Sequence, residues 1–197
     1  MAQDIKTADI AIIGTGPAGI SAAITAKIRN KEIFLFGAEP VSSKVAKAHR
    51  ILNYPGLPAV SGEELAQAYK RHLDELQIAV TKKRVHAVYA MGSYFAIQAG
   101  QEQYRADSVI LACGMTADKP FPGENEFLGR GVSYCATCDA QFFKGKTVAV
   151  IGYTKESVEE AQYLAEIVGK VLYFPMGKEA VLPELSDNIE ICMEKPA

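Results

Sequence analysis

The sequence predicts an α/β protein made of two Rossmann-like, three-layer domains. Residues 9–36 and residues 147–174 follow one plan: an apolar strand, a glycine turn, a helix and a second strand. Between them, residues 119–123 read Lys-Pro-Phe-Pro-Gly, which is typical of a rigid connector. We therefore expect a first domain at residues 1–118 and a smaller second domain at residues 119–197.

Both segments show the hydrophobic patterns of buried elements. Residues 10–13 and 33–36 are short apolar runs that predict buried strands, and the alanine-rich residues 20–28 between them predict a helix. In the second segment, residues 147–151 and 171–174 predict strands. An apolar stripe at helical spacing predicts the helix that joins them.

The chain between these segments is mixed. Ser61 and Glu64 form a capping box that opens a helix to about Leu76. Further short strands are expected at residues 85–91, 94–98, 108–112 and 189–192.

Composition excludes several classes of protein. Hydrophobic residues make up 49% and charged residues 22%, and the formal net charge is −2, so nucleic-acid binding has no electrostatic support. No apolar stretch is long enough to cross a bilayer. The polar N-terminus enters a strand without the pattern of a signal peptide, so we expect a cytoplasmic protein.

The turn after the first strand reads Gly14-Thr-Gly16-Pro-Ala-Gly19, a G-x-G-x-x-G fingerprint. It has its full context, because a strand precedes it, a helix follows, and the acidic Glu39 stands 20 residues after Gly19. Gly14 permits the tight turn, Gly16 lets backbone approach a pyrophosphate, and Gly19 lets helix and strand pack closely. The alternative is a turn with glycines for packing alone. We predict a dinucleotide-type cofactor, with Glu39 accepting hydrogen bonds from a ribose.

Cys135-Ala-Thr-Cys138 is the chemically richest motif. Its spacing allows a reversible disulfide, and a helix that begins at the first cysteine lowers the pKa of its thiol. Pairs of this spacing have potentials near about −270 to −180 mV, within reach of a reduced flavin. Zinc, a passive structural disulfide and two idle thiols are the alternatives. No histidine has ligand spacing, so we expect no metal site.

Several motifs together resemble the thioredoxin reductase family of FAD-containing pyridine-nucleotide disulfide oxidoreductases. They are the Gly16-Pro-Ala-Gly start, the Asn53-Tyr-Pro-Gly segment, the Leu-Ala-Cys-Gly run ending at Gly114, and residues 129–139 around the cysteine pair. The likeness covers essentially the whole chain. It implies an FAD-binding first domain and a disulfide-bearing second domain.

The resemblance also implies roles for single residues. Cys138 lies next to the flavin, Cys135 attacks the disulfide of the protein substrate, and Asp139 protonates a departing thiolate. Cys113 and Cys192 are expected to be buried apolar fillers. The residues implied to bind FAD are Gly14, Gly16, Pro17, Ala18, Gly19, Phe36, Gly37, Glu39, Lys44, Val45, Asn53, Val85, Ala112 and Gly114.

The second glycine turn departs from the pattern of an NADPH site. Tyr153 and Thr154 put side chains where backbone must approach a pyrophosphate, and Glu156 adds negative charge. From residue 152 to the end the net charge is −5, with no arginine to bind a 2′-phosphate. NADPH is therefore not the expected donor. The pattern is most similar to the ferredoxin-dependent flavin thioredoxin reductase branch.

Residues 41–50 support that branch, because they replace the Gly-Gly-Gln-Leu segment of NADPH enzymes with several positive charges. Ferredoxins are acidic, so a basic docking surface is expected. The candidate clusters are Lys44, Lys47 and Arg50, or Lys82, Lys83 and Arg84. An ordinary solvated surface is the alternative for both.

The family is longer than this chain. Its FAD domain has a second half, with a Gly-Asp motif, after the disulfide domain, so we expect the chain to be truncated at its C-terminus.

The expected function is a flavin-dependent reductase that passes electrons from ferredoxin through FAD and the cysteine pair to thioredoxin. The resemblance implies a homodimer. The alternatives are an NADPH-dependent thioredoxin reductase or peroxidase-reductase component, and a non-catalytic redox-sensing module.

Overall fold

The computed structural model describes residues 5–114, 120–176 and 186–194. The chain divides into two compact units, residues 1–129 and residues 130–197. The domain boundary expected between residues 118 and 119 falls within residues 115–119, which are outside the described part of the chain. That boundary, and the connector at its start, stay predictions.

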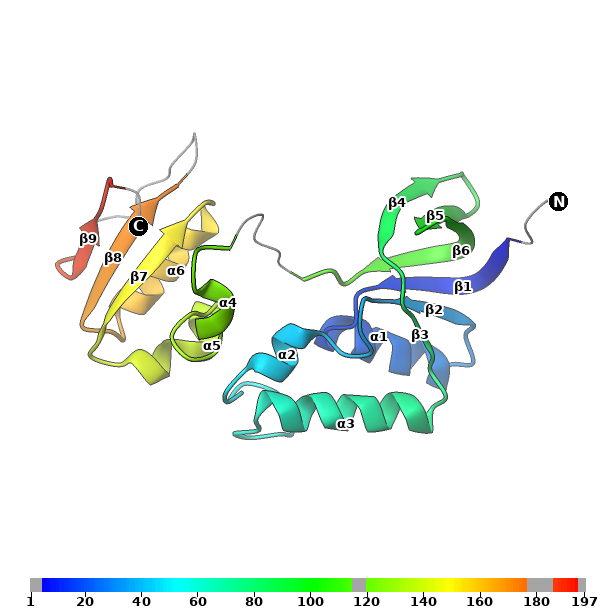
Figure 1. Ribbon diagram of the computed structural model, residues 1–197, viewed down its shortest axis with the longest axis horizontal. Coiled ribbons are helices and arrows are strands. Elements are labelled where there is room, and N and C mark those ends of the chain that lie inside the picture. The colour runs from blue at the N-terminus through cyan, green and yellow to red at the C-terminus, as the bar shows by residue number, and fades with distance from the viewer. Residues whose placement is uncertain (1–4, 115–119, 177–185, 195–197) are drawn as a thin grey trace. The chain divides into compact units, whose positions relative to one another are not determined.

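A six-stranded sheet forms the first unit, in the order β3-β2-β1-β6-β5-β4 (Figure 1). Its central strand β1 pairs in parallel with β2 on one side and with β6 on the other. β6 also pairs antiparallel with β5, and β5 with β4, so β6 is shared between the parallel and antiparallel parts. The strands are β1 (Lys6–Ile13), β2 (Ile33–Phe36), β3 (Val80–Thr81), β4 (Val85–Ala90), β5 (Phe95–Ala99) and β6 (Glu102–Leu111).

Both faces of the parallel strands are buried. Successive side chains point to opposite sides of the sheet, and each side is covered. Ile12 and Leu35 pack with the helices α1 (Pro17–Ile28) and α3 (Gly62–Glu75). Ala11 and Phe36 point the other way and pack with residues of β4 and β5, such as Ile97. The first unit therefore has the three layers that the sequence predicts.

Local signals set the ends of α3. Ser61 accepts a hydrogen bond from the Glu64 amide at 3.2 Å, and the Glu64 carboxylate accepts one from the Ser61 amide at 2.9 Å. These bonds form the predicted capping box and satisfy amides that a helix start leaves without partners. Two short helices that the sequence analysis did not predict, α2 (Ser43–Lys47) and α4 (Glu124–Phe127), complete the unit.

The second unit contains a parallel sheet in the order β7-β8-β9. The strands β7 (Thr147–Gly152), β8 (Lys170–Pro175) and β9 (Ile189–Ile191) agree with the predicted ones to within one or two residues. Helix α6 (Glu156–Ala165) covers one face, and its Ala161 packs with Val171 and Tyr173 of β8 in a buried core.

The helix α5 (Ala136–Asp139) and the 3₁₀ helix η1 (Ala140–Phe143) precede this sheet. Among the described residues, none of the helices is both long and apolar enough for a membrane span.

Candidate active site

The fingerprint turn after β1 contains glycines of two kinds. Gly14 has φ +123°, and a Cβ atom there would collide with the carbonyl oxygen of Ala112. A Cβ atom on Gly19 would collide with the Gly14 carbonyl. At Gly16, by contrast, a Cβ atom would meet nothing within 4 Å. Packing within the protein explains Gly14 and Gly19, but it does not explain Gly16, so this position fits the close approach of a ligand.

Helix α1 begins beside Gly16 with its first turn open to a ligand. Pro17 is the first helical residue, no side chain caps the helix at Gly16, and the first turn carries no acidic residue. The amides of a first helical turn lack partners within the helix, and the helix dipole places positive charge there. The start of α1, with Ala18 exposed in its first turn, is therefore suited to bind phosphate.

The segment after β2 lies beside the same turn. The Gly14 amide donates to the Phe36 carbonyl at 2.8 Å, while the Phe36 side chain is buried in the core. Phe36 can therefore reach a cofactor only through its backbone. Gly37 and Glu39 follow, and Glu39 is exposed, as a ribose-binding carboxylate must be.

The predicted residues Lys44 and Val45 lie on α2, which rests against the start of α3. The Gly62 amide donates to the Ala48 carbonyl at 2.8 Å, and a Cβ atom on Gly62 would collide with the Val45 carbonyl. Asn53 is exposed in the loop that the Ile51–Val60 bridge closes.

Three further predicted residues lie on or after the strands. Val85 begins β4 and packs into the core that contains Phe36. Ala112 directly follows β6 and touches the fingerprint turn through Gly14. Gly114 is exposed with φ +66°. The structure therefore brings Ala112 to the fingerprint turn.

In the second unit, Cys135 and Cys138 form a disulfide with an S–S distance of 2.05 Å. Cys135 is the N-cap residue of α5, and its sulfur accepts a hydrogen bond from the Cys138 amide at 3.2 Å. A helix therefore begins at the first cysteine, as predicted. An amide that donates to a sulfur favours the thiolate form after reduction, because it stabilises negative charge there.

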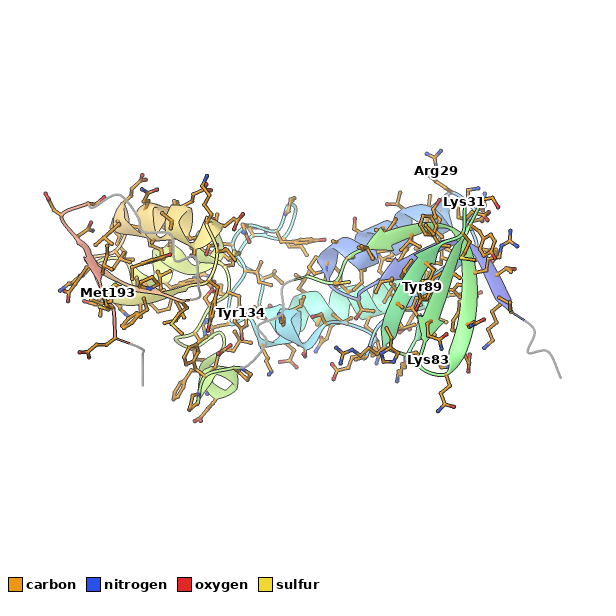
Figure 2. All side chains as sticks on the ribbon, turned by 90° about the horizontal axis from the view of Figure 1, so that it is seen from above. Arg29, Lys31, Lys83, Tyr89, Tyr134 and Met193 are labelled. Carbon is orange, nitrogen blue, oxygen red and sulfur yellow. A yellow bond between two sulfur atoms is a disulfide. The ribbon has the colours of Figure 1, made fainter. Side chains whose placement is uncertain are left out.

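Neighbouring residues hold the cysteine pair in place. Ser133 accepts a hydrogen bond from the Cys135 amide at 3.0 Å and donates one to the Cys135 carbonyl at 3.2 Å. Tyr134, which lies between Ser133 and Cys135 in the sequence and is labelled in Figure 2, is half-buried. Ala140 directly follows the half-buried Asp139 and belongs to the core beneath α6.

The second glycine turn, after β7, is closed by side chains of its own unit. A Cβ atom on Gly152 would collide with the hydroxyl of Tyr173 and would stand 2.7 Å from the Ser157 hydroxyl. Ser157 in turn bonds the Thr154 carbonyl at 2.5 Å and lies 3.0 Å from the Tyr173 hydroxyl. Tyr173 and Ser157 are both buried, so the space beside this glycine is filled.

The start of α6 also differs from the start of α1 in charge. The pKa of Glu156 is lowered, chiefly because its carboxylate accepts a hydrogen bond from its own amide, and also through the Thr154 side chain and the Lys155 charge. A carboxylate thus takes a position at a helix start where a pyrophosphate would otherwise bind.

The expectation that the two remaining cysteines are buried is wrong. Cys113 is exposed and Cys192 is half-buried, and both are free thiols. Cys113 lies two residues after the end of β6, and Cys192 directly follows β9. Because both lie beyond the ends of their strands, neither side chain is enclosed in a core. Across the described ranges, no group of His, Cys, Asp and Glu side chains is arranged to hold a metal ion.

Three residues that shape these sites, Thr15, Ser133 and Tyr173, were not predicted from the sequence. Thr15, inside the fingerprint, and Tyr173, in β8, are both buried, but no pattern in the sequence indicates this. Ser133 could have been recognised, because a serine hydroxyl in a turn often forms a hydrogen bond with the backbone two residues later.

A nucleotide-type turn with open space at Gly16, followed in the same chain by a C-x-x-C disulfide, defines the class of dinucleotide-binding disulfide oxidoreductases. A comparison with protein families gives the particular family. The model of the pyridine nucleotide-disulphide oxidoreductases matches residues 8–196, and the chain belongs to that family.

Individual relatives agree with this assignment. The chain is 38% identical to the thioredoxin reductase of Aquifex aeolicus (strain VF5) over 196 residues, which cover 96% of this chain and 60% of the relative. It is 36% identical to that of Bacillus subtilis (strain 168) over 84% of this chain and 53% of the relative. The chain thus spans roughly half to three fifths of the length of these curated relatives.

Solved structures give the same picture. A ferredoxin-flavin thioredoxin reductase from Clostridium acetobutylicum is 46% identical, with a TM-score of 0.56, over 96% of this chain and 66% of that chain. A thioredoxin reductase from Streptococcus pyogenes MGAS5005 is 29% identical, with a TM-score of 0.75, over 94% of this chain and 63% of that chain.

Proposed function

We propose that this chain carries the disulfide centre and the N-terminal FAD-binding portion of a flavin-dependent thioredoxin reductase that takes its electrons from ferredoxin. The observation that carries the proposal is the contrast between the two glycine turns of a chain with a C-x-x-C disulfide. The first has open space at Gly16 and no acidic residue in the helix turn that follows, whereas the second has Thr154 at the position equivalent to Gly16 and Glu156 at its helix start.

The first turn fits FAD. The open space at Gly16 receives the pyrophosphate, the start of α1 supplies amide donors, and the exposed Glu39 carboxylate accepts hydrogen bonds from the ribose. The other residues proposed to contact FAD are those named in the sequence analysis. When bound, FAD accepts single electrons from a donor and supplies pairs of electrons to a disulfide.

The cysteine pair then reduces the substrate in two exchanges. Reduction of the Cys135–Cys138 disulfide by two electrons leaves two thiol groups. The Cys135 thiolate attacks the disulfide of thioredoxin, a mixed disulfide forms, and one thioredoxin sulfur leaves and is protonated by Asp139. The Cys138 thiolate attacks the Cys135 sulfur, which releases reduced thioredoxin and restores the disulfide. The hydrogen bond from the Cys138 amide favours the Cys135 thiolate.

The second turn supports ferredoxin as the donor. A nucleotide pyrophosphate needs a residue without a side chain at the second glycine position of the fingerprint and a helix start without negative charge. Here Thr154 occupies the position equivalent to Gly16, and the Glu156 carboxylate lies at the start of α6. The similarity to the ferredoxin-flavin thioredoxin reductase from Clostridium acetobutylicum adds weight to this choice.

Charge pairing favours one of the two candidate docking clusters. Lys83, labelled in Figure 2, forms an ion pair with Glu102, which also binds Lys6 at 3.2 Å. Glu102 thus neutralises part of the cluster that contains Lys83. Lys47 and Arg50 are exposed at and after the end of α2, so we propose that ferredoxin docks there. As the family resemblance implies, we further propose a homodimer in the cytoplasm.

Anaerobic flavin absorbance tests the donor. The flavin-loaded protein is titrated with NADPH and then with reduced ferredoxin. We expect loss of the visible absorption band of the oxidised flavin only with ferredoxin, after about two electrons per flavin and two more for the disulfide. Loss of the band with NADPH would show that the Gly152 turn binds nucleotide and would overturn the ferredoxin assignment. Oxidation and reduction without turnover of thioredoxin would favour a redox-sensing module.

A further inference from the structure

The segment that bears Glu39 has no regular secondary structure. Residues 37–42 follow the end of β2 as a series of bends, before α2 begins at Ser43. No ladder of strand hydrogen bonds therefore fixes the position of the Glu39 carboxylate. A residue that binds ribose must nevertheless be held within a limited distance of the pyrophosphate site, because the ribose and the pyrophosphate are neighbouring parts of one ligand.

Thr15 supplies that restraint from inside the fingerprint turn. Its hydroxyl donates to the Glu39 carbonyl at 2.9 Å, and its own carbonyl accepts a hydrogen bond from the Ser42 amide at 2.9 Å. The two bonds hold the segment at two points, on either side of Pro40 and Val41. The Thr15 side chain is only 6% exposed, so water competes little for its hydroxyl.

Gly37 provides a second, independent sign that Thr15 is built into this site. A Cβ atom on Gly37 would collide with the Thr15 methyl group, and would stand 2.7 Å from the Thr15 hydroxyl and 3.1 Å from the Glu39 carbonyl. Gly37 has no positive φ that would by itself call for glycine. Its missing side chain makes room for the threonine.

We propose that Thr15 is a positioning residue for cofactor binding. Its hydroxyl holds the Glu39 backbone so that the Glu39 carboxylate can reach the ribose, while its neighbours Gly14 and Gly16 form the turn for the pyrophosphate. The inference rests on the proposed binding of FAD. It assigns a function to the position between the first two fingerprint glycines, where the side chain faces the protein rather than the ligand.

The affinity for FAD tests this proposal, measured by the quenching of flavin fluorescence on addition of FAD-depleted protein. Thr15→Val keeps the shape and the methyl group but removes the hydroxyl. We expect it to weaken FAD binding about fivefold to tenfold, which is the size of one lost hydrogen bond. Thr15→Ser restores the hydroxyl, and we expect its affinity within about twofold of the natural protein.

A matched control and a double-mutant cycle separate positioning from general destabilisation. Thr25→Val, in α1, also removes a threonine hydroxyl that bonds a backbone carbonyl, that of Ser21 at 2.8 Å, and we expect unchanged affinity. Glu39→Ala removes the carboxylate but keeps the carbonyl that Thr15 bonds. In that background, we expect Thr15→Val to weaken FAD binding by less than about twofold, because Thr15 acts through Glu39.

Three outcomes overturn the inference. Affinity unchanged in Thr15→Val, an equal loss in the Glu39→Ala background, or no rescue by Thr15→Ser would each show that the hydroxyl does not position Glu39. If Thr15→Val melts too early to assay, Thr15→Ala serves as the second hydroxyl-free variant. If the natural protein itself does not bind FAD, the proposed function fails as well. If Glu39→Ala weakens binding and Thr15→Val does not, only the inference fails.

Discussion

At the scale of single residues, the glycines of the fingerprint turn have separable roles. Gly14 and Gly19 lie against backbone, whereas Gly16 borders open space. Gly16 also has φ −81°, which an alanine adopts without strain. One turn thus contains two glycines that packing requires and one, Gly16, that packing does not require.

A pair of alanine substitutions tests this separation. We expect Gly16→Ala to leave the melting temperature of the cofactor-free protein within about 2 °C, because its Cβ meets nothing, and to weaken FAD binding at least about tenfold. Gly19→Ala, the matched variant, forces a Cβ against the Gly14 carbonyl and should destabilise the fold by about 1–3 kcal/mol. Equal melting temperatures for the two variants would contradict this assignment of roles.

The division of labour between the cysteines gives a second prediction. Cys138→Ser leaves Cys135 without a resolving thiol, so incubation with oxidised thioredoxin should trap a covalent complex, seen by mass spectrometry and lost on reduction. Because Cys113 is exposed, Cys138→Ser combined with Cys113→Ser is the control, and it should trap the same complex. If no thioredoxin gives a covalent complex, or if the complex is lost when Cys113 is replaced, the roles proposed for the pair are contradicted.

The identity of the key residues was readable from the sequence, but their surroundings were not. The cysteine spacing predicted the disulfide, and the structure confirms it. The exposure of Cys113 was not predicted, because a free cysteine usually behaves as a small apolar residue and is buried. β6 ends at Leu111, two residues earlier, so Cys113 lies beyond the sheet.

At the scale of elements, an ionic cluster joins the two ends of the antiparallel region. Glu102, at the start of β6, binds Lys83, the hydroxyl of Tyr104 at 2.8 Å and Lys6 of β1. These groups lower the pKa of Glu102 to about 2, with the hydrogen bond from Lys83 as the largest cause. The ammonium groups of Lys6 and Lys83 also lie 5.5 and 5.9 Å from the centre of the Tyr104 ring.

This cluster predicts a pH dependence. A carboxylate whose pKa is depressed in the folded state stabilises the fold above its ordinary pKa of 4.5, and this stabilisation is lost as the pH falls toward about 2. We expect Glu102→Gln to lower the melting temperature at pH 7. Between about pH 4.5 and pH 2, the melting temperature of the variant should approach that of the natural protein. The exposed Glu75 gives the control variant Glu75→Gln, for which we expect no such convergence. A difference that is constant with pH would contradict the role of the charge.

Elements with strong local signals were predicted well, and short or amphipathic ones were not. The capping box and the apolar run at β2 were found at their places. The first half of β6 was missed because polar residues such as Arg105 alternate with the buried Tyr104 and the small Ala106, which makes a weak pattern. Helix α2 has five residues, too few for a helical period to show.

At the scale of the whole molecule, charge is divided unevenly along the chain. Residues 152–197 carry a net −5, so the rest of the chain carries +3 in a total of −2. An acidic electron donor is therefore attracted to the first part of the chain and repelled by the last. Two basic clusters of that first part remain as docking candidates, and charge pairing favours the one at α2.

Charge reversal distinguishes the two clusters. Lys47→Glu with Arg50→Glu should slow flavin reduction by ferredoxin about tenfold at low salt and flatten its dependence on ionic strength. Lys82→Glu with Arg84→Glu makes the same change of charge at the other cluster, and we expect only a small effect, measured by stopped-flow absorbance. The reverse ranking would move the docking surface to the edge beside β4.

The two-unit α/β organisation was predictable because each unit repeats a strand, turn and helix plan with short, continuously apolar strands. What the sequence could not give was the space around each turn. Gly14 and Gly152 are the equivalent first glycines of the two turns, and only the structure shows that Gly14 lies against the Ala112 carbonyl, that Gly152 lies against the Tyr173 hydroxyl, and that the space at Gly16 is open.

The filled turn after β7 also bears on how easily evolution or a protein engineer can change the electron donor of such a chain. Replacing Tyr153 and Thr154 by smaller residues leaves the Glu156 carboxylate at the start of α6, and replacing Glu156 leaves the Tyr173 hydroxyl against Gly152. No single substitution removes all of these groups. If the proposed donor is right, we expect a change to a nucleotide donor to require several substitutions together.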